Sequence, residues 1–312
     1  YNLRIAAADI ANVIDFKTVS ISLTSLAHAI LQKSLSLARS TLNNIASPTS
    51  DLELGIIAYG KLGSMELGYN SDLDIVFVYN QPADELPADK LKRRYYFSRL
   101  VQRLLHVLTT RTSAGDLYSV DTRLRPSGHS GTLVTPIQAY AEYLHQSAWT
   151  WELQALIRAR LIVGGDSLNT KFEEVRREAL CKLRKPEKLK QDIIKMRARI
   201  REKYGITKGF NLKYDTGGLV DVEFLCQYLV LSNASSFPEI ISYRGSLDII
   251  HKAKELNLVS VEDSNLIEQI IKSYLAKQHT LKLNRLPLEL PLESFDRERN
   301  CVSRLWDKYV EN

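Results

Sequence analysis

The feature that most constrains this chain is the stretch SDLDIVFVYN at residues 71–80, where two aspartates stand before a run of β-branched and aromatic residues. The run predicts a strand. Side chains at positions i and i+2 lie on the same face of a strand, so Asp72 and Asp74 would point to one side and Leu73 and Ile75 to the other. Two carboxylates this close repel each other unless a cation compensates them. The pattern therefore predicts a cation partner, and Mg²⁺ prefers such hard oxygen ligands.

A third aspartate stands in the segment DLYSVDTRLR at 116–125, where alternating apolar and polar side chains also predict a strand. A short apolar run at 54–60 predicts a further, buried strand that ends at a glycine. If the predicted strands at 71–80 and 116–125 are neighbours, the three carboxylates can converge. Such a cluster can hold two metal ions, one at the attacking oxygen and one at the leaving group. The predicted catalytic and metal-binding residues are Asp72, Asp74 and Asp121.

The glycine-rich segment GKLGS at 60–64 separates the first two predicted strands. Glycines let a backbone approach a phosphate closely, and Lys61 and Ser64 add a positive charge and a hydroxyl group. Arg123 and Arg125, which would lie on the same face as the third aspartate, could contact a triphosphate or neutralise the carboxylates. Each of these features alone is more often structural than functional. Together, in this order along the chain, they favour a metal–phosphate site.

Beyond residue 136 the strand signals fade and apolar residues recur at helical spacing. We expect a mostly helical α+β protein, with a catalytic domain and a mixed sheet over 1–165 and an all-helical domain over 186–312. Helices are predicted at 22–45, 90–109, 136–162, 187–205, 218–231, 246–257 and 294–310, and Ser260 is predicted to cap one more.

Four side chains of the predicted helix at 136–162 carry expectations of their own. Trp149 and Trp151 are expected in the core. Arg158 and Arg160 stand two residues apart. Two such residues on a helix cannot share a face, so at most one of them is expected to reach a cleft.

Composition argues against several classes of protein. The chain has 312 residues and a formal net charge of +6, a mild excess that suits phosphate-bearing ligands. The sequence contains no run of about 18 uncharged apolar residues, so no membrane-spanning helix is predicted. It also lacks a pronounced basic stripe with interleaved aromatics, which argues against nucleic-acid binding. The three cysteines are far apart and lack metal-ligand spacing, which is typical of a reducing compartment, so we expect a cytoplasmic protein. The chain begins at Tyr1 rather than Met, and we expect a fragment of a longer protein.

Longer motifs resemble the glutamine synthetase adenylyltransferase/adenylyl-removing family. The resemblance is carried by GKLGSMELGYNSDLDIVFVY, DLYSVDTRLRPSGHSGTLV, AWTWELQALIRAR, NLKYDTGGLVDVEFLCQYLVL and the opening LRIAAADIA. Members of this family combine two homologous halves, of which one adds AMP to glutamine synthetase and the other removes it by phosphorolysis. ELGYNSDLD and AWTWE resemble the adding half, so the chain resembles the C-terminal adenylyltransferase domain.

The resemblance implies a DNA-polymerase-β-like nucleotidyltransferase core followed by a helical bundle. It also implies ATP as substrate, two Mg²⁺ ions for which Mn²⁺ could substitute, and glutamine synthetase as the protein substrate. The PII signalling protein would act through the full-length enzyme. In the helical part, Asp221 and Glu223 could line the cleft or simply start a helix, where acidic residues are favoured. The implied nucleotide-binding residues are Lys61, Gly63, Ser64, Ser71, Arg123 and Arg125.

Three functions follow from these motifs. The preferred one is a two-metal transfer of AMP from ATP to a tyrosine hydroxyl of glutamine synthetase, with release of pyrophosphate, in the control of nitrogen assimilation. An alternative is the reverse half of the family, which removes AMP from adenylyl-tyrosine by phosphorolysis and gives ADP. A third is a regulatory docking module with a vestigial site, against which the complete set of three aspartates argues.

Overall fold

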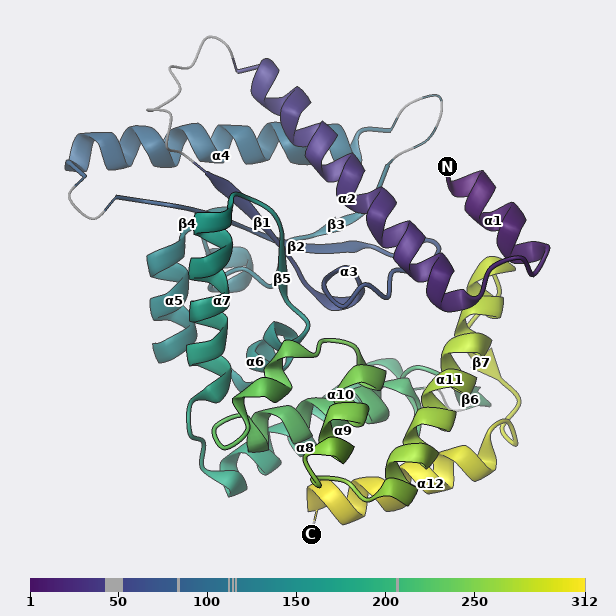
Figure 1. Cartoon of the computed structure of the whole chain (residues 1–312). Helices are drawn as coiled ribbons and strands as arrows, with labels where there is room; N and C mark the ends of the chain where they lie inside the picture. Colours follow the sequence, from purple (N-terminus) through teal and green to yellow (C-terminus); the bar gives the residue numbers. More distant parts are fainter. Residues whose placement is uncertain are drawn as a thin grey trace. The chain divides into compact units, whose positions relative to one another are not determined.

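The computed structural model describes all residues except 43–52, 83, 84, 112, 114, 116, 206, 207 and 312. The chain divides into two compact units (Figure 1). The first consists of Tyr1–Ala148 and Arg158–Ala179, and the second of Trp149–Ile157 and Leu180–Asn312. Among the described residues, no helix is long and apolar enough to cross a membrane.

The first unit is built around a five-stranded sheet in which the strand order is β3-β2-β1-β5 and β4 also pairs with β2. Strand β1 is antiparallel to β2 and β5, whereas β2 is parallel to β3 and β4. The mixed sheet and the many helices confirm the predicted α+β class. The strands are β1 (Leu54–Ala58), β2 (Leu73–Tyr79), β3 (Val120–Asp121), β4 (Val134–Pro136) and β5 (Arg160–Val163).

Strands β1 and β2 are buried on both faces, which explains their nearly continuous apolar sequence. Alternate residues of both strands, among them Leu73 and Ile75, join the main apolar core together with residues of α2 (Phe16–Ser40) and α4 (Pro87–Thr109). These two helices lie across the sheet in Figure 1. The odd positions of β2 are thus committed to this core, which leaves Asp74 on the other face.

Among its described residues the first unit contains four further helices, of which α7 ends two residues beyond the unit, and one short 3₁₀ turn. Helix α1 is tied to the loop before β2 by the hydroxyl of Tyr69, which donates a hydrogen bond of 2.9 Å to Asp9. The helices are α1 (Asn2–Ile10), α3 (Gly60–Gly63), α5 (Ile137–Gln146) and α7 (Asp166–Cys181), and the 3₁₀ turn is Gly128–Ser130.

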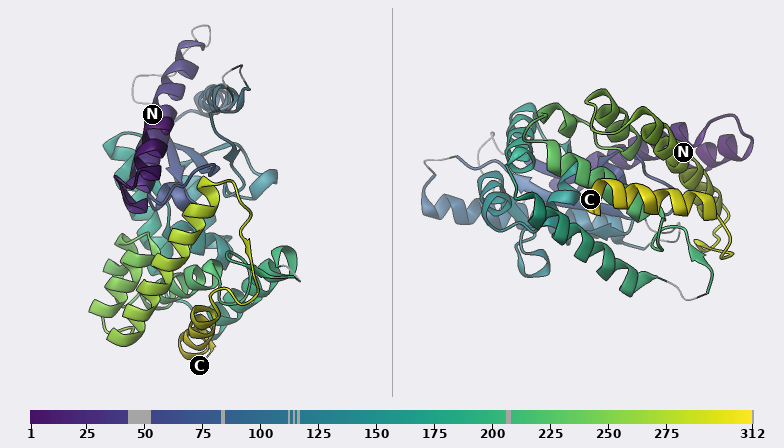
Figure 2. Two further views of the ribbon diagram at one scale, coloured as in Figure 1. Left: turned by 90° about the vertical axis from the view of Figure 1, so that its right-hand side faces the viewer. Right: turned by 90° about the horizontal axis from the view of Figure 1, so that it is seen from below.

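The second unit is a bundle of helices (Figure 2). Its central helix, α9, is buried along most of its length and contacts the other α-helices that the structure describes in this unit. The unit also contains a short antiparallel pair, β6 (Phe210–Asn211) with β7 (Glu289–Leu290), which the prediction of an all-helical domain missed. Its helices are α6 (Thr150–Ile157), α8 (Pro186–Tyr204), α9 (Leu219–Asn233), α10 (Ser246–Glu255), α11 (Val261–Leu283) and α12 (Asp296–Trp306), with short turns of other helix types at Pro238–Ser242 and Asp307–Glu311.

Local signals predicted most helices, and the cap at Ser260 is confirmed, because its side chain accepts a hydrogen bond of 3.1 Å from the backbone N–H of Asp263. The helical prediction for residues 136–162 is confirmed over most of this segment and is wrong at its end. These residues form two helices followed by β5, since the segment RLIV pairs with β1. Trp149 and Trp151 do not lie in the core either: they are 69% and 37% exposed.

Candidate active site

The two aspartate-bearing strands are neighbours. Strands β2 and β3 run parallel, with Leu73 opposite Val120 and Asp74 opposite Asp121. The backbone N–H of Leu73 donates to the carbonyl of Ser119 at 2.9 Å. Directly paired residues of adjacent strands project to the same face of a sheet, so both half-buried carboxylates share one face. This pairing brings together two residues that are 47 positions apart in the sequence.

Asp72 lies outside the strand, because β2 begins at Leu73. Its side chain is exposed, and Ser71 before it accepts a hydrogen bond of 3.2 Å from the backbone N–H of Gly68. Among the described residues, no group of three or more His, Cys, Asp or Glu side chains is arranged to hold a metal ion. Asp74 and Asp121 therefore present carboxylate oxygens on one face of the sheet, whereas Asp72 lies before the strand, and the three are not arranged as a metal site.

Asp121 already has a positively charged partner. The Nε of Arg123 donates to its two carboxylate oxygens at 3.0 and 2.7 Å, the Nη2 donates to Oδ2, and the backbone N–H of Arg123 donates to Oδ1 at 2.8 Å. These bonds hold the pKa of Asp121 below its ordinary value, although partial burial acts in the opposite direction. The Arg123 side chain is 66% exposed, so a ligand in solution could reach this guanidinium.

Arg125, which the sequence placed on the same strand face, does not continue a strand, since β3 ends at Asp121. Its guanidinium donates to the carbonyl and hydroxyl of Thr122 at 2.9 and 2.7 Å, and to the carbonyl of Gly131 at 3.3 Å. Arg125 thus organises the loop that follows β3. The strand predicted at 116–125 is short in the part that the structure describes, since only Val120 and Asp121 pair with β2.

The glycine turn, which we define as residues 60–66, lies directly beside Asp74. Gly60 has a φ of +50°, which favours glycine, and a Cβ atom at this position would lie 2.6 Å from Oδ2 of Asp74. The backbone N–H of Tyr59 donates to the carbonyl of Asp74 at 2.8 Å. The turn and the aspartate pair are therefore parts of one local arrangement, with half-buried Lys61 in the short helix α3.

Two arginines that the sequence had placed on a helix both reach this turn. Arg158 follows the end of α6, and its guanidinium forms an ion pair with Glu66 while its Nε donates to Ser64 Oγ at 3.2 Å. Arg160 begins β5, and its Nε lies 3.3 Å from the carbonyl oxygen of Gly63. The expectation that both lie on a helix, where they could not share a face, is wrong, because α6 ends at Ile157 and β5 begins at Arg160. The run RLIV, rich in β-branched residues, was the signal that could have shown this.

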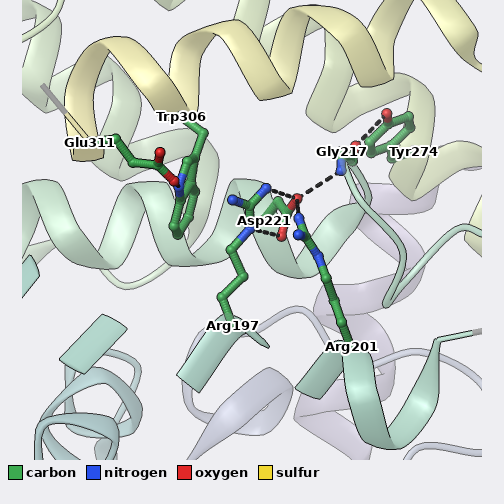
Figure 3. Close-up of polar contacts among 7 residues, drawn as sticks. All are labelled: Arg197, Arg201, Gly217, Asp221, Tyr274, Trp306 and Glu311. Atoms are coloured by element: carbon green, nitrogen blue, oxygen red, sulfur yellow. Dashed lines mark hydrogen bonds and ion pairs between the residues drawn. The ribbon is translucent and has the colours of Figure 1, made fainter. Parts of the chain in front are cut away.

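In the second unit, Asp221 is 1% exposed. Its carboxylate accepts hydrogen bonds from Nε and Nη2 of Arg197 at 2.7 and 2.5 Å, from Nη2 of Arg201 at 2.8 Å and from the backbone N–H of Gly217 at 2.7 Å (Figure 3). The structure thus places Asp221 inside the bundle rather than on an open surface. Glu223, on the same helix, is half-buried.

Comparison with known proteins gives matches along the whole chain. The family model described as "Glutamate-ammonia ligase adenylyltransferase" matches residues 1–175. Three similar curated proteins share the description bifunctional glutamine synthetase adenylyltransferase/adenylyl-removing enzyme. The protein of Vibrio parahaemolyticus is 41% identical over 98% of this chain and 34% of its own length. Those of Idiomarina loihiensis and Nitrosococcus oceani are both 39% identical over 99% of this chain, and over 34% and 33% of their own lengths. The chain thus spans about a third of the length of these relatives.

Proposed function

Because this chain belongs to the glutamate–ammonia ligase adenylyltransferase family, we propose that it is a nucleotidyltransferase that moves AMP from ATP to a tyrosine hydroxyl of glutamine synthetase and releases pyrophosphate. The observation that carries the proposal is the register of β2 and β3, which sets Asp74 beside Asp121 next to a glycine turn. The motifs ELGYNSDLD and AWTWE support the adenylylating rather than the adenylyl-removing reaction.

In this proposal the chain's own residues bind and orient the nucleotide. The glycine turn, with Gly63, Ser64 and Lys61, receives the phosphates, since a glycine backbone allows close approach. Ser71, Arg123 and Arg125 lie on the loops at either side of the aspartates. Positively charged and hydroxyl groups placed there would offset the negative charge of the triphosphate and of the leaving pyrophosphate. Asp121 is the proposed acceptor of the tyrosine proton.

Mg²⁺, or Mn²⁺ in its place, belongs to the proposal as the cofactor, with Asp72, Asp74 and Asp121 as its oxygen ligands. When bound, such ions stabilise the charge that develops on the attacking and leaving oxygens. The oxygen-only donor set supports this choice of metal. The metal and the Arg123 guanidinium would then share the carboxylate oxygens of Asp121.

The partners and the compartment are proposed on the same basis. Glutamine synthetase is the proposed protein substrate. The PII signalling protein is proposed to act through a full-length enzyme of the size of the relatives. The reaction would take place in the cytoplasm and contribute to the control of nitrogen assimilation.

The test is to incubate the chain with ATP, Mg²⁺ and unmodified glutamine synthetase and to measure the intact mass of the synthetase subunit. We expect a gain of one AMP, which Asp74→Asn abolishes because it removes a clustered charge while the apolar core of β2 stays intact. Asp89→Asn, an exposed aspartate on α4, is the matched control and should transfer normally. Full transfer by the Asp74 variant would contradict the proposed site. ADP formed from adenylylated synthetase and phosphate, without transfer in the forward assay, would favour the removing reaction.

A further inference from the structure

A closed set of hydrogen bonds links Ser64, Glu66 and Arg158 beside the glycine turn. The hydroxyl of Ser64 donates to Glu66 Oε2 at 2.7 Å and accepts from Nε of Arg158 at 3.2 Å. The third side of the triangle is the ion pair between Arg158 and Glu66, whose side chains are only 11% and 24% exposed. A charge-assisted pair that is largely shielded from water is stronger than an exposed one.

The backbone of the turn rests on the same segment. A Cβ atom at Gly63 would lie 2.0 Å from the carbonyl oxygen of Arg158 and 2.6 Å from that of Ala58, so the two backbones are in direct contact. Arg160 adds hydrogen bonds to the end of α3, at 3.3 Å to the carbonyl of Gly63 and 3.5 Å to that of Leu62. The segment 158–160 therefore supports the turn through backbone packing and through two guanidinium groups.

The triangle decides where the Ser64 hydroxyl points. Ser64 has one proton to donate, and the bond to Glu66 at 2.7 Å is shorter than the one to the carbonyl of Gly60 at 3.1 Å. The Nε–H of Arg158 occupies one of its two lone-pair directions. With both contacts in place the hydroxyl has a single orientation, in which its proton points to Glu66 and its oxygen is held beside the turn by Arg158.

We propose that Arg158, held by Glu66, is a positioning residue for the nucleotide phosphates, acting through Ser64 and the glycine turn rather than by touching ATP. The inference rests on the proposed function, because it takes the turn as the phosphate-binding element. Lysine cannot replace Arg158, since an ammonium group cannot contact Ser64 and Glu66 with the fixed fork of a guanidinium. A misplaced binding element weakens both the affinity for a ligand and its orientation.

The experiment measures binding of Mg²⁺–ATP to the whole 312-residue chain by calorimetry, without glutamine synthetase. The variants are Arg158→Lys, Glu66→Gln and the double variant. We expect each single variant to weaken binding by about tenfold, by analogy with the loss of a residue that orients a metal ligand. The double variant should bind Mg²⁺–ATP as tightly as the single variant with the lower affinity, because both changes break the same triangle of hydrogen bonds. In the separate transfer assay with glutamine synthetase, the KM for ATP should rise by a larger factor than kcat falls.

Arg93→Lys is the matched control. Arg93 forms a similarly shielded ion pair in the same unit, with Glu85 at 2.6 Å. It lies on α4, which carries none of the candidate site residues. The control variant should lower the midpoint of thermal unfolding without changing ATP affinity. If Arg158→Lys does not fold, the nearly isosteric Glu66→Gln decides. Unchanged ATP affinity in Glu66→Gln, or additive effects in the double variant, would overturn the inference. If the wild-type chain binds ATP but transfers no AMP, only the proposed function fails, whereas absence of ATP binding in the wild type overturns both.

Discussion

Asp221→Asn gives the sharpest test of how the second unit is held together. The carboxylate is 1% exposed and accepts hydrogen bonds from Arg197, Arg201 and the backbone of Gly217 (Figure 3). Arg197 itself is buried, and its guanidinium lies 3.9 Å from the ring centroid of Trp306. An asparagine would keep the shape but remove the negative charge, and its NH₂ group would face the N–H groups of the guanidinium, donor against donor.

The expected loss is large because the change leaves a buried cation without its counter-charge. Removal of one partner of a buried pair costs about 3–5 kcal/mol. The free energy of unfolding of a whole domain is about 5–15 kcal/mol. The variant should therefore lose a substantial part of the stability of the second unit. The loss should be about 3 kcal/mol rather than about 5 kcal/mol if Arg201, whose side chain is 30% exposed, turns to solvent.

Tryptophan fluorescence during urea unfolding measures this loss in the right part of the molecule. The chain has three tryptophans, Trp149, Trp151 and Trp306, and all lie in the second unit. Asp248→Asn is a matched control, because Asp248 is also the third residue of its helix but is exposed. Its loss should not exceed the contribution of an acidic residue to the helix dipole, about 0.3–1 kcal/mol.

The reasoning is refuted if Asp221→Asn lowers the free energy of unfolding no more than Asp248→Asn does. A different result, in which Asp221→Asn keeps its stability but loses ATP binding, would support the cleft role that the sequence suggested for this residue. The buried ion pair predicts the opposite: a destabilised second unit and, well below the unfolding midpoint, unchanged ATP binding.

Three other changes test the first unit. Gly60→Ala should destabilise it by about 1–2 kcal/mol in urea unfolding, because its positive φ strains a side chain that would also press on Asp74. Gly63→Ala should cost more in the same assay, since its Cβ would meet a backbone carbonyl at 2.0 Å rather than a carboxylate tip; an equal or smaller cost would argue against this packing. Arg123→Ala should raise the pKa of Asp121, followed by NMR of its carboxyl carbon, because it removes the main group that lowers it. A lowered pKa stabilises the fold above the ordinary value of 3.8, and this contribution is lost as the pH falls through the folded value. The variant should therefore lose less stability than the wild type on acidification below pH 3.8, and an equal loss would count against the ion pair.

The sequence by itself determined the features that depend on a few neighbouring residues. The strand at 71–80, the glycine turn before it, the cap at Ser260 and most helices follow from spacing and turn chemistry. Such signals are local, since one strand or one helix turn fixes which side chains share a face. The two faces of β2, with Leu73 and Ile75 in the core, could be assigned for this reason.

Only the tertiary structure decided which distant segments meet. The sequence identified Asp74 and Asp121 as candidates, but their proximity depended on whether their strands are neighbours. The parallel pairing of β2 and β3 shows that they are. The segment after α6 was read as helix because its apolar spacing suits both states, and pairing with β1 made it a strand. That pairing carries Arg158 to the glycine turn. Packing around α9 likewise buries Asp221. Strand partners and burial are set by contacts across the whole fold, which no local pattern of residues specifies.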